Sequence, residues 1–247
     1  MRIALIACRV LEDEIATHAG AAEIANGRCY HELGLHDRSD ELRTQLQRDI
    51  NALDARDDID AIVLVYGLCG LGTAGLRAGR HPLVIPRAHD CITLFMGSKE
   101  AYTAHQAACP QCYYFSPGWM REERTPGPER LDALRRELSE RFDDPEDVEF
   151  LVETEQSLWA VRDRVTFLDL GTPEAPVFVE KAREAADRLG WKFEYIVGDP
   201  ALLRDLLNGP WDDERFQIVP PGETLGHAPD ENIFRIAGTG VRSQESE

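Results

Sequence analysis

The chain has 247 residues, and its 45 acidic residues outnumber its 27 basic ones, which gives a formal net charge of −18. This surplus of negative charge repels nucleic-acid phosphates and anionic membrane surfaces, so we expect neither nucleic acid nor membrane as a partner. No apolar run approaches the ~20 residues of a transmembrane helix, and no cleavage site of a signal peptide follows the short apolar N-terminus, so we expect a cytoplasmic protein.

The first half of the chain alternates apolar runs with helical patterns. Continuous apolar runs of this kind are typical of strands buried on both faces. Ser39 is a candidate N-cap for a helix over residues 40–55, and a further helix is expected over residues 92–106. The runs that predict strands are residues 2–8, 59–67, 81–86 and 111–119.

The second half predicts an amphipathic helix over residues 129–142 and an acidic break at 143–149. Two strand–loop–helix units follow, then a last strand and a frayed tail. These elements are expected over residues 164–190, 192–209, 216–223 and 239–247.

This alternation predicts an α/β fold, with a mostly parallel sheet flanked by helices in Rossmann-like βα units. We expect a single domain over residues 1–247, or two βα subdomains with a break near 143–149.

Three cysteines and one histidine follow the predicted strands. Cys8 ends the first apolar run, Cys69 lies two residues past the second, and His89 and Cys91 follow the third. In open α/β sheets the ligand site lies beyond the carboxyl ends of the strands, so we expect all four side chains on one rim. Helix N-termini after the cysteines would favour thiolates.

A plainer interpretation makes each cysteine a small buried hydrophobic residue and His89 an ordinary loop histidine. The glycines around Cys69 do not match a nucleotide-binding loop, but Gly67 and Gly70 would let the backbone approach a cofactor closely. Cys109 and Cys112 form a C-x-x-C pair without a partner pair at zinc-ribbon spacing, so they indicate metal or redox chemistry only weakly.

Three thiolates and an imidazole fit two kinds of metal centre. One is a [4Fe–4S] cluster held by Cys8, Cys69 and Cys91, with the fourth iron free or held by His89. The other is a tetrahedral zinc site with all four residues as ligands. Structural zinc sites usually take close pairs of cysteines from loops, whereas these come singly from distant strands, which favours the cluster.

An open iron would bind a substrate oxygen or sulfur as a Lewis acid. Glu12 or Asp90 could move a proton, and Arg87 could hold an anionic group, although a solvated acid and a surface ion pair are the plainer roles. The sequence thus predicts an enzyme of lyase or desulfurising type that acts on a small anionic molecule.

Several segments resemble the DUF1638 family over most of the chain, namely ACRVLEDEI, YGLCG, PRAHDCITLFMGS, YYFSPGW and GPWDDERFQIVPPGE. The family has no settled activity, but the resemblance implies that the gene for this protein lies beside genes for corrinoid-dependent methyltransferases. It therefore suggests an alternative: a zinc–thiolate protein for methyl transfer, or an accessory that handles a corrinoid for a methyltransferase partner. A metal-free α/β binding module is a third possibility, and Cys109 and Cys112 depart from the family pattern.

Overall fold

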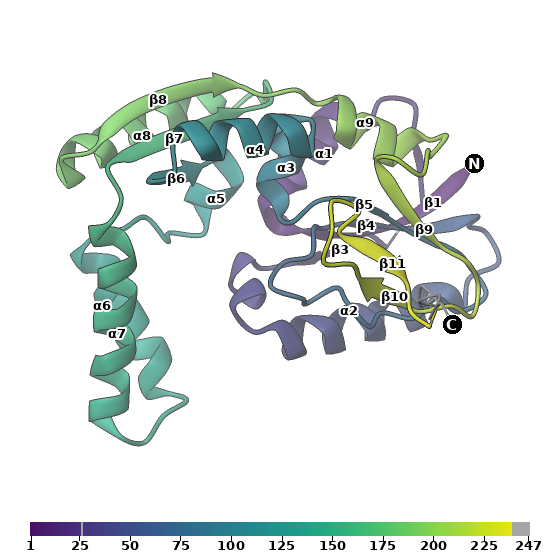
Figure 1. Cartoon of the computed structure of the whole chain (residues 1–247), viewed down its shortest axis with the longest axis horizontal. Coiled ribbons are helices and arrows are strands. Elements are labelled where there is room, and N and C mark those ends of the chain that lie inside the picture. The colour runs from purple at the N-terminus through teal and green to yellow at the C-terminus, as the bar shows by residue number, and fades with distance from the viewer. Residues whose placement is uncertain (26, 239–247) are drawn as a thin grey trace, which may run out of the picture. The chain divides into compact units, whose positions relative to one another are not determined.

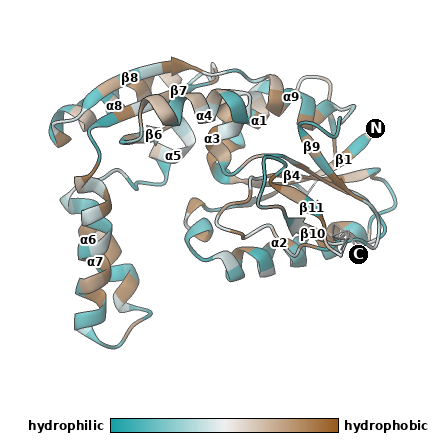
Figure 2. Ribbon diagram, viewed as in Figure 1, coloured by the Kyte–Doolittle hydropathy of each residue, from teal (hydrophilic) through white to brown (hydrophobic). Residues whose placement is uncertain are grey.

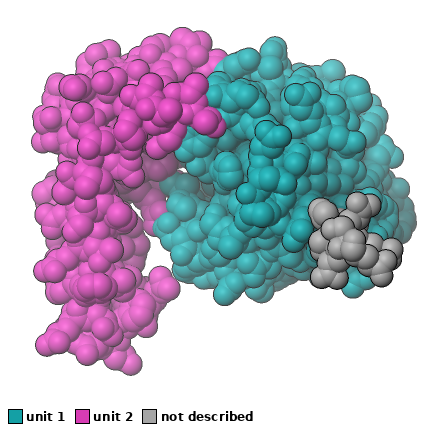
Figure 3. Space-filling model, viewed as in Figure 1, with its two compact units in different colours: residues 1–102, 199–247 teal, residues 103–198 magenta. Residues whose placement is uncertain are grey.

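The computed structural model describes residues 1–25 and 27–238, so the tail expected to fray at 239–247 lies outside the described residues. The chain divides into two compact units, coloured separately in Figure 3. Unit 1 comprises residues 1–102 and 199–247, and unit 2 comprises residues 103–198. The division therefore does not fall at 143–149, because those residues lie inside unit 2 and include the start of a helix.

The main sheet of unit 1 is mostly parallel, in the order β2-β1-β4-β5-β9, with β3 also paired to β1 (Figure 1). Strands β1, β4 and β5 are parallel neighbours and are almost entirely buried, as their continuous apolar runs predict. The predicted last strand, β9, runs antiparallel to β5. The bounds are β1 (Arg2–Cys8), β2 (Glu23–Ile24), β3 (Cys29–His31), β4 (Ala61–Val65), β5 (Leu83–Pro86) and β9 (Phe216–Val219).

The helices of unit 1 confirm one prediction and change two. Helix α2 (Ser39–Asp54) buries the predicted apolar stripe, but Ser39 is its first residue and not its N-cap. The hydroxyl of Ser39 instead donates to the carbonyl of Gly70, 2.6 Å away. The helix expected over 92–106 is two helices, because Gly97 adopts a left-handed φ of 82° and ends the first of them. The other elements are α1 (Glu12–His18), α3 (Cys91–Met96), α4 (Lys99–Ala108), α9 (Ala201–Asn208), β10 (Leu225–His227), β11 (Phe234–Ile236) and two 3₁₀ helices, Arg9–Leu11 and Leu33–Asp37. Helix α4 begins in unit 1 and continues into unit 2 from Thr103.

Unit 2 has a parallel sheet of its own, β6-β7-β8, so the strands of the chain do not form one continuous sheet. One face of this sheet packs an aromatic core that includes Phe115, Phe167 and Phe178. The sequence did not indicate α7, which mixes hydrophobic and hydrophilic residues along its length (Figure 2). The bounds are β6 (Cys112–Phe115), β7 (Arg164–Asp169), β8 (Lys192–Val197), α5 (Pro117–Arg121), α6 (Pro128–Ser139), α7 (Pro145–Ala160) and α8 (Ala175–Leu189).

Asp54 ties the end of α2 to the segment that enters β5. Its carboxylate accepts hydrogen bonds from the backbone N–H groups of Arg80 and His81, each at 2.9 Å, and lies 3.1 Å from the His81 ring. Burial alone would raise the pKa of Asp54, but these bonds outweigh it and hold that pKa below its ordinary value. The carboxylate form therefore stabilises the fold.

We expect Asp54→Ala to lower the free energy of unfolding by about 1–3 kcal/mol near neutral pH, because the backbone N–H groups of Arg80 and His81 both lose a charged hydrogen-bond acceptor. The folded pKa is depressed, so this stability is present above about pH 4 and is lost as the pH falls through the folded pKa. Urea unfolding at several pH values should show the difference from the wild type shrinking below about pH 4. A difference that stays constant with pH would contradict this account.

Candidate metal centre

The three cysteines at strand ends lie on one rim of the unit 1 sheet. Cys8 is the last residue of β1, Cys69 lies in the loop after β4, and Cys91 is the first residue of α3, after β5. Because β1, β4 and β5 are parallel neighbours, their carboxyl ends share an edge. The topology therefore brings together three residues that are far apart in the sequence.

The thiols lie close enough for their charges to interact. Burial raises the pKa of Cys69 to about 12, and the charge of Cys8 contributes to that rise. Burial also raises the pKa of Cys91 well above its ordinary value, with further increases from Asp90, Cys8 and Cys69. Without a metal the thiols of Cys69 and Cys91 are protonated at neutral pH, so a metal that binds them must displace their protons.

The three sulfurs are spread more widely than a single metal ion requires. Among the described residues, one set of three His, Cys, Asp or Glu ligand atoms lies within 4.8 Å of one another, and it does not include these cysteines. Zinc–thiolate bonds of about 2.3 Å would place the sulfurs of a tetrahedral site only about 3.8 Å apart. A four-iron cluster binds each cysteine through a different iron, so it fits a wider set of thiols.

The hydroxyl of Tyr66 is buried beside the three cysteines without a hydrogen-bond partner among the described residues. The residue is only 3% exposed, and burial followed by the charges of Cys8 and Cys69 raises the pKa of Tyr66 well above its ordinary value. A buried polar group left unsatisfied costs about 1–3 kcal/mol. The hydroxyl is therefore free to hydrogen-bond to a water or to a group bound at this rim.

His31 is a candidate site residue that sequence reasoning missed. It ends β3 and pairs in register with Cys8, so it lies on the same rim as the cysteines. Its Nε2 atom lies 2.7 Å from Oδ2 of Asp49, a residue of α2 whose charge also acts on Tyr66. The cysteines were selected because they follow predicted strands. The same criterion would have selected His31 if the sequence had shown that the short strand β3 ends at this residue.

The loops that carry Cys69 and Cys91 are joined through their backbones. The N–H of Leu68 donates to Ala88 and that of Cys69 to His89, at 2.8 and 2.9 Å. A Cβ atom on Gly67 would lie 2.6 Å from the backbone nitrogen of Asp90, so only glycine allows this approach. Cys69 adopts a left-handed φ of 46° without being glycine, a strained conformation that is typical of functional sites.

A family model described as "protein of unknown function (DUF1638)" matches residues 30–207, which is more than half of the chain. The chain belongs to the DUF1638 family. The resemblance seen in the sequence motifs is thereby confirmed. The matched range contains Cys69 and Cys91 but begins after Cys8. No curated protein and no solved structure matches this DUF1638 chain.

Asp90 positions Cys91 in this DUF1638 protein. Its carboxylate caps α3 by accepting from the N–H of Ile92 at 3.0 Å, and it accepts from the hydroxyl of Tyr102 at 3.0 Å. Burial raises the pKa of Asp90, although these hydrogen bonds oppose the rise. A role in moving protons remains a prediction for Asp90.

The other predicted residues lie near the rim in different settings. His89 precedes Asp90 with its side chain exposed, and its charge lowers the pKa of Asp90. Glu12 is the partly exposed first residue of α1. Gly70, with φ of 62°, continues the left-handed turn begun at Cys69. Ligation by His89, proton transfer by Glu12 and cofactor contact by Gly70 stay predictions.

No helix in the described part of this chain is long and apolar enough to cross a membrane.

Arg87 is engaged by the protein itself. Its guanidinium donates to the backbone carbonyls of Asp213, Asn232 and Phe234 at 2.7–2.8 Å, and to the side chain of Gln217 at 3.1 Å. These contacts tie the end of β5 to the C-terminal strands of unit 1. They leave few N–H donors of the guanidinium available to bind an anion. We therefore do not include Arg87 in the proposed site.

We expect Arg87→Ala to lower the free energy of unfolding by about 2–4 kcal/mol, because several carbonyls lose a charged donor. The substitution should not change the metal content of the folded protein, because Arg87 is not among the candidate ligands. Urea unfolding and metal analysis of the variant and the wild type together check this expectation. A variant as stable as the wild type would show that the guanidinium is available for another purpose, such as holding an anion.

Proposed function

We propose that this DUF1638 protein holds a [4Fe–4S] cluster through Cys8, Cys69 and Cys91, and that it is an enzyme acting on a small anionic molecule. The observation that carries the proposal is the convergence of three cysteines that follow three neighbouring parallel strands. The hydroxyl of Tyr66 at the same rim is available to hydrogen-bond to a bound group.

A cluster with three cysteine ligands supplies one open iron that can act as a Lewis acid. The substrate would offer an anionic oxygen or sulfur, such as a carboxylate or a thiolate. We assign the reaction to the lyase or desulfurising class, in which a C–O or C–S bond is broken beside the group that is bound.

The residues of the chain would then handle protons and orientation. Tyr66 stays a neutral phenol because its pKa is raised, so its hydroxyl can donate a hydrogen bond to a bound oxygen. The His31–Asp49 pair places an imidazole nitrogen 2.7 Å from a carboxylate oxygen, and this imidazole is a candidate general acid or base. Asp90 holds the first turn of α3, and with it Cys91, in place.

Purification without oxygen tests the proposal. We expect a brown protein with absorption near ~400 nm and about four irons and four sulfides per chain. A colourless protein with one zinc per chain would overturn the cluster and favour the zinc–thiolate alternative linked to methyl transfer. A protein with neither metal, even after reconstitution with iron and sulfide, would favour a metal-free binding module.

Tyr66→Phe provides a matched variant, because it removes only the hydroxyl oxygen. We expect this variant to keep its iron, because the phenol is not a ligand in this proposal. We also expect the metal-free variant to be at least as stable as the metal-free wild type, because the substitution removes a buried hydroxyl that has no hydrogen-bond partner. Iron analysis and thermal unfolding of the metal-free protein measure both. Loss of iron would show instead that the oxygen binds the metal.

A further inference from the structure

One face of the unit 2 sheet is polar where it meets α4. Tyr114, Thr166 and Glu194 lie in register on β6, β7 and β8, so their side chains form one row across the sheet. Cys112 lies two residues before Tyr114 and therefore on the same face. Thr166 is fully buried, although threonine side chains are mostly exposed in folded proteins.

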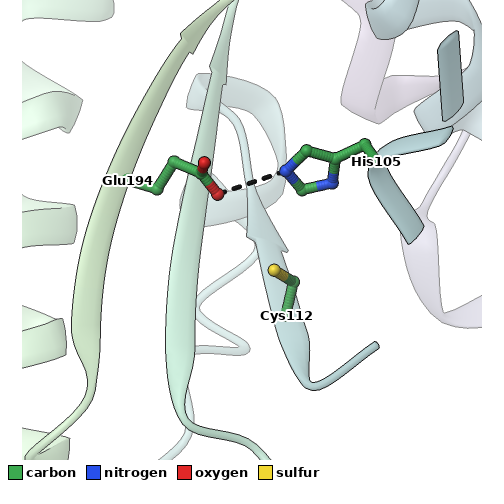
Figure 4. Close-up of side chains that lie close together, drawn as sticks. All are labelled: His105, Cys112 and Glu194. Atoms are coloured by element: carbon green, nitrogen blue, oxygen red, sulfur yellow. Dashed lines mark hydrogen bonds and ion pairs between the residues drawn. The ribbon is translucent and has the colours of Figure 1, made fainter. Parts of the chain in front are cut away.

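His105 of α4 completes a set of metal-ligating side chains over this row. A ring nitrogen of His105, the sulfur of Cys112 and a carboxylate oxygen of Glu194 all lie within 4.8 Å of one another. Figure 4 shows the three side chains converging from α4, β6 and β8. The Nε2 atom of His105 is 3.1 Å from Oε2 of Glu194, and Cys112 is only 2% exposed.

The groups around these side chains orient them as metal ligands are usually oriented. The other ring nitrogen of His105, Nδ1, is hydrogen-bonded to the hydroxyl of Tyr114 at 2.8 Å. The hydroxyl of Thr166 donates to Oε2 of Glu194 at 3.0 Å. Metal-binding histidines and carboxylates typically have such second partners, which fix the ring tautomer and the carboxylate orientation.

Two features oppose metal binding in the form observed. Cys112 is joined to Cys109 in a disulfide, and a disulfide sulfur is not a thiolate ligand. In addition, Nη1 of Arg164 lies 3.6 Å from Oε2 of Glu194 and partly neutralises that carboxylate. Cys109 and Cys112 do not lie at a helix N-terminus, because Cys109 follows the end of α4 and Cys112 is the first residue of β6. The position therefore does not lower the pKa of either thiol in the way that is typical of catalytic redox pairs.

We propose that reduction of the Cys109–Cys112 disulfide creates a zinc site made of His105, Cys112 and Glu194, and that oxidation closes it. A dithiol reductant supplies two electrons and two protons, so that the S–S bond becomes two thiols and the reductant becomes a disulfide. Zn²⁺ then displaces the proton of the Cys112 thiol and separates His105 from Glu194. Cys109, released beside Cys112, is the candidate fourth ligand. Nitrogen, sulfur and oxygen donors in a set of four suit Zn²⁺.

The test uses full-length protein freed of metal by a chelator and titrated with Zn²⁺ against a chromophoric competitor. One sample is first reduced with a phosphine, which converts the disulfide and one water into two thiols and a phosphine oxide. The other keeps the Cys109–Cys112 disulfide. We expect the reduced protein to bind one more zinc per chain than the disulfide form, in the wild type and in Cys91→Ser alike, because the inference is independent of the unit 1 centre.

Variants locate the additional zinc. We expect Glu194→Gln and Cys112→Ser to lose it, and Thr166→Val to bind it about tenfold or more weakly. Glu184→Gln is the matched control, because Glu184 is exposed on α8 of the same unit and should leave zinc binding unchanged. Far-ultraviolet circular dichroism verifies that each variant is folded, and Glu194→Gln decides the question if Cys112→Ser is not.

Equal zinc binding by the reduced and disulfide forms would overturn the proposal. So would an additional zinc that survives in Glu194→Gln, since the carboxylate would then not be a ligand. Loss of the additional zinc in Cys91→Ser but not in Glu194→Gln would assign it to the unit 1 rim and would equally overturn the inference.

Discussion

We expect Cys91→Ala to remove all of the iron from this DUF1638 protein while leaving it folded. A cluster cannot be held by the two remaining cysteines, whereas the two sheets and their helices provide a core that does not depend on a metal. Asp90 still caps α3 in the variant, so the loop keeps its local structure. Iron per chain, absorption near ~400 nm and the thermal midpoint measure the effect.

Cys109→Ala and Cys29→Ala are the controls for this experiment. Cys109 belongs to unit 2, and Cys29 lies on β3 two residues before the end of that strand, so both should keep the wild-type iron content. Loss of the sulfur of Cys29 or Cys91 alone costs about 1 kcal/mol, which corresponds to about 2–4 °C in thermal midpoint for a chain of this size. Cys109→Ala also breaks the Cys109–Cys112 disulfide, so it should lower the thermal midpoint further while still leaving the iron content unchanged. An unchanged iron content in Cys91→Ala would end the cluster hypothesis.

Gly67→Ala should have the second large effect. The added Cβ atom would lie 2.6–2.8 Å from backbone atoms of His89 and Asp90, and a backbone cannot move aside as a flexible side chain can. The loop that carries Cys91 must shift away from the loop that carries Cys69. We expect the free energy of unfolding to fall by about 1–3 kcal/mol and the iron content to fall with it.

Gly171→Ala separates this steric effect from the general cost of replacing a glycine. Gly171 has a left-handed φ of 78°, but no atom outside its immediate chain neighbours lies within 4 Å of the position that an added methyl group would take. The substitution should therefore cost about 1–2 kcal/mol of backbone strain and leave the iron content unchanged. If Gly67→Ala also kept full iron content, the close contact between the two loops would not be needed for the metal centre.

The parallel strands and the rim could be predicted from sequence because each depends on a local pattern. The apolar runs before Cys8, Cys69 and Cys91 are long enough to indicate buried strands, and parallel strands place their carboxyl ends together. The apolar stripe of α2 likewise follows from residue spacing alone. These features required no knowledge of which strands are neighbours.

The sequence did not predict elements that depend on the conformation of a single residue or on packing against another element. A left-handed Gly97 divides the helix after Cys91, although most isolated glycines in a helical pattern do not. Helix α7 buries Val148 and Val152 against Leu138 of α6, so much of its stability comes from that packing. The second sheet could not be separated from the first, because strand patterns do not say which strands pair.

The amino-acid sequence by itself determined the α/β class, the family and the positions of three cysteines at strand ends. Only the tertiary structure decided that Arg87 is engaged by distant carbonyls, and that His31 and Tyr66 stand beside the cysteines. It alone brought His105 to Glu194, 89 positions away. The reason is physical: periodicity is a property of one segment, whereas register and packing are properties of segments that meet only in the folded chain.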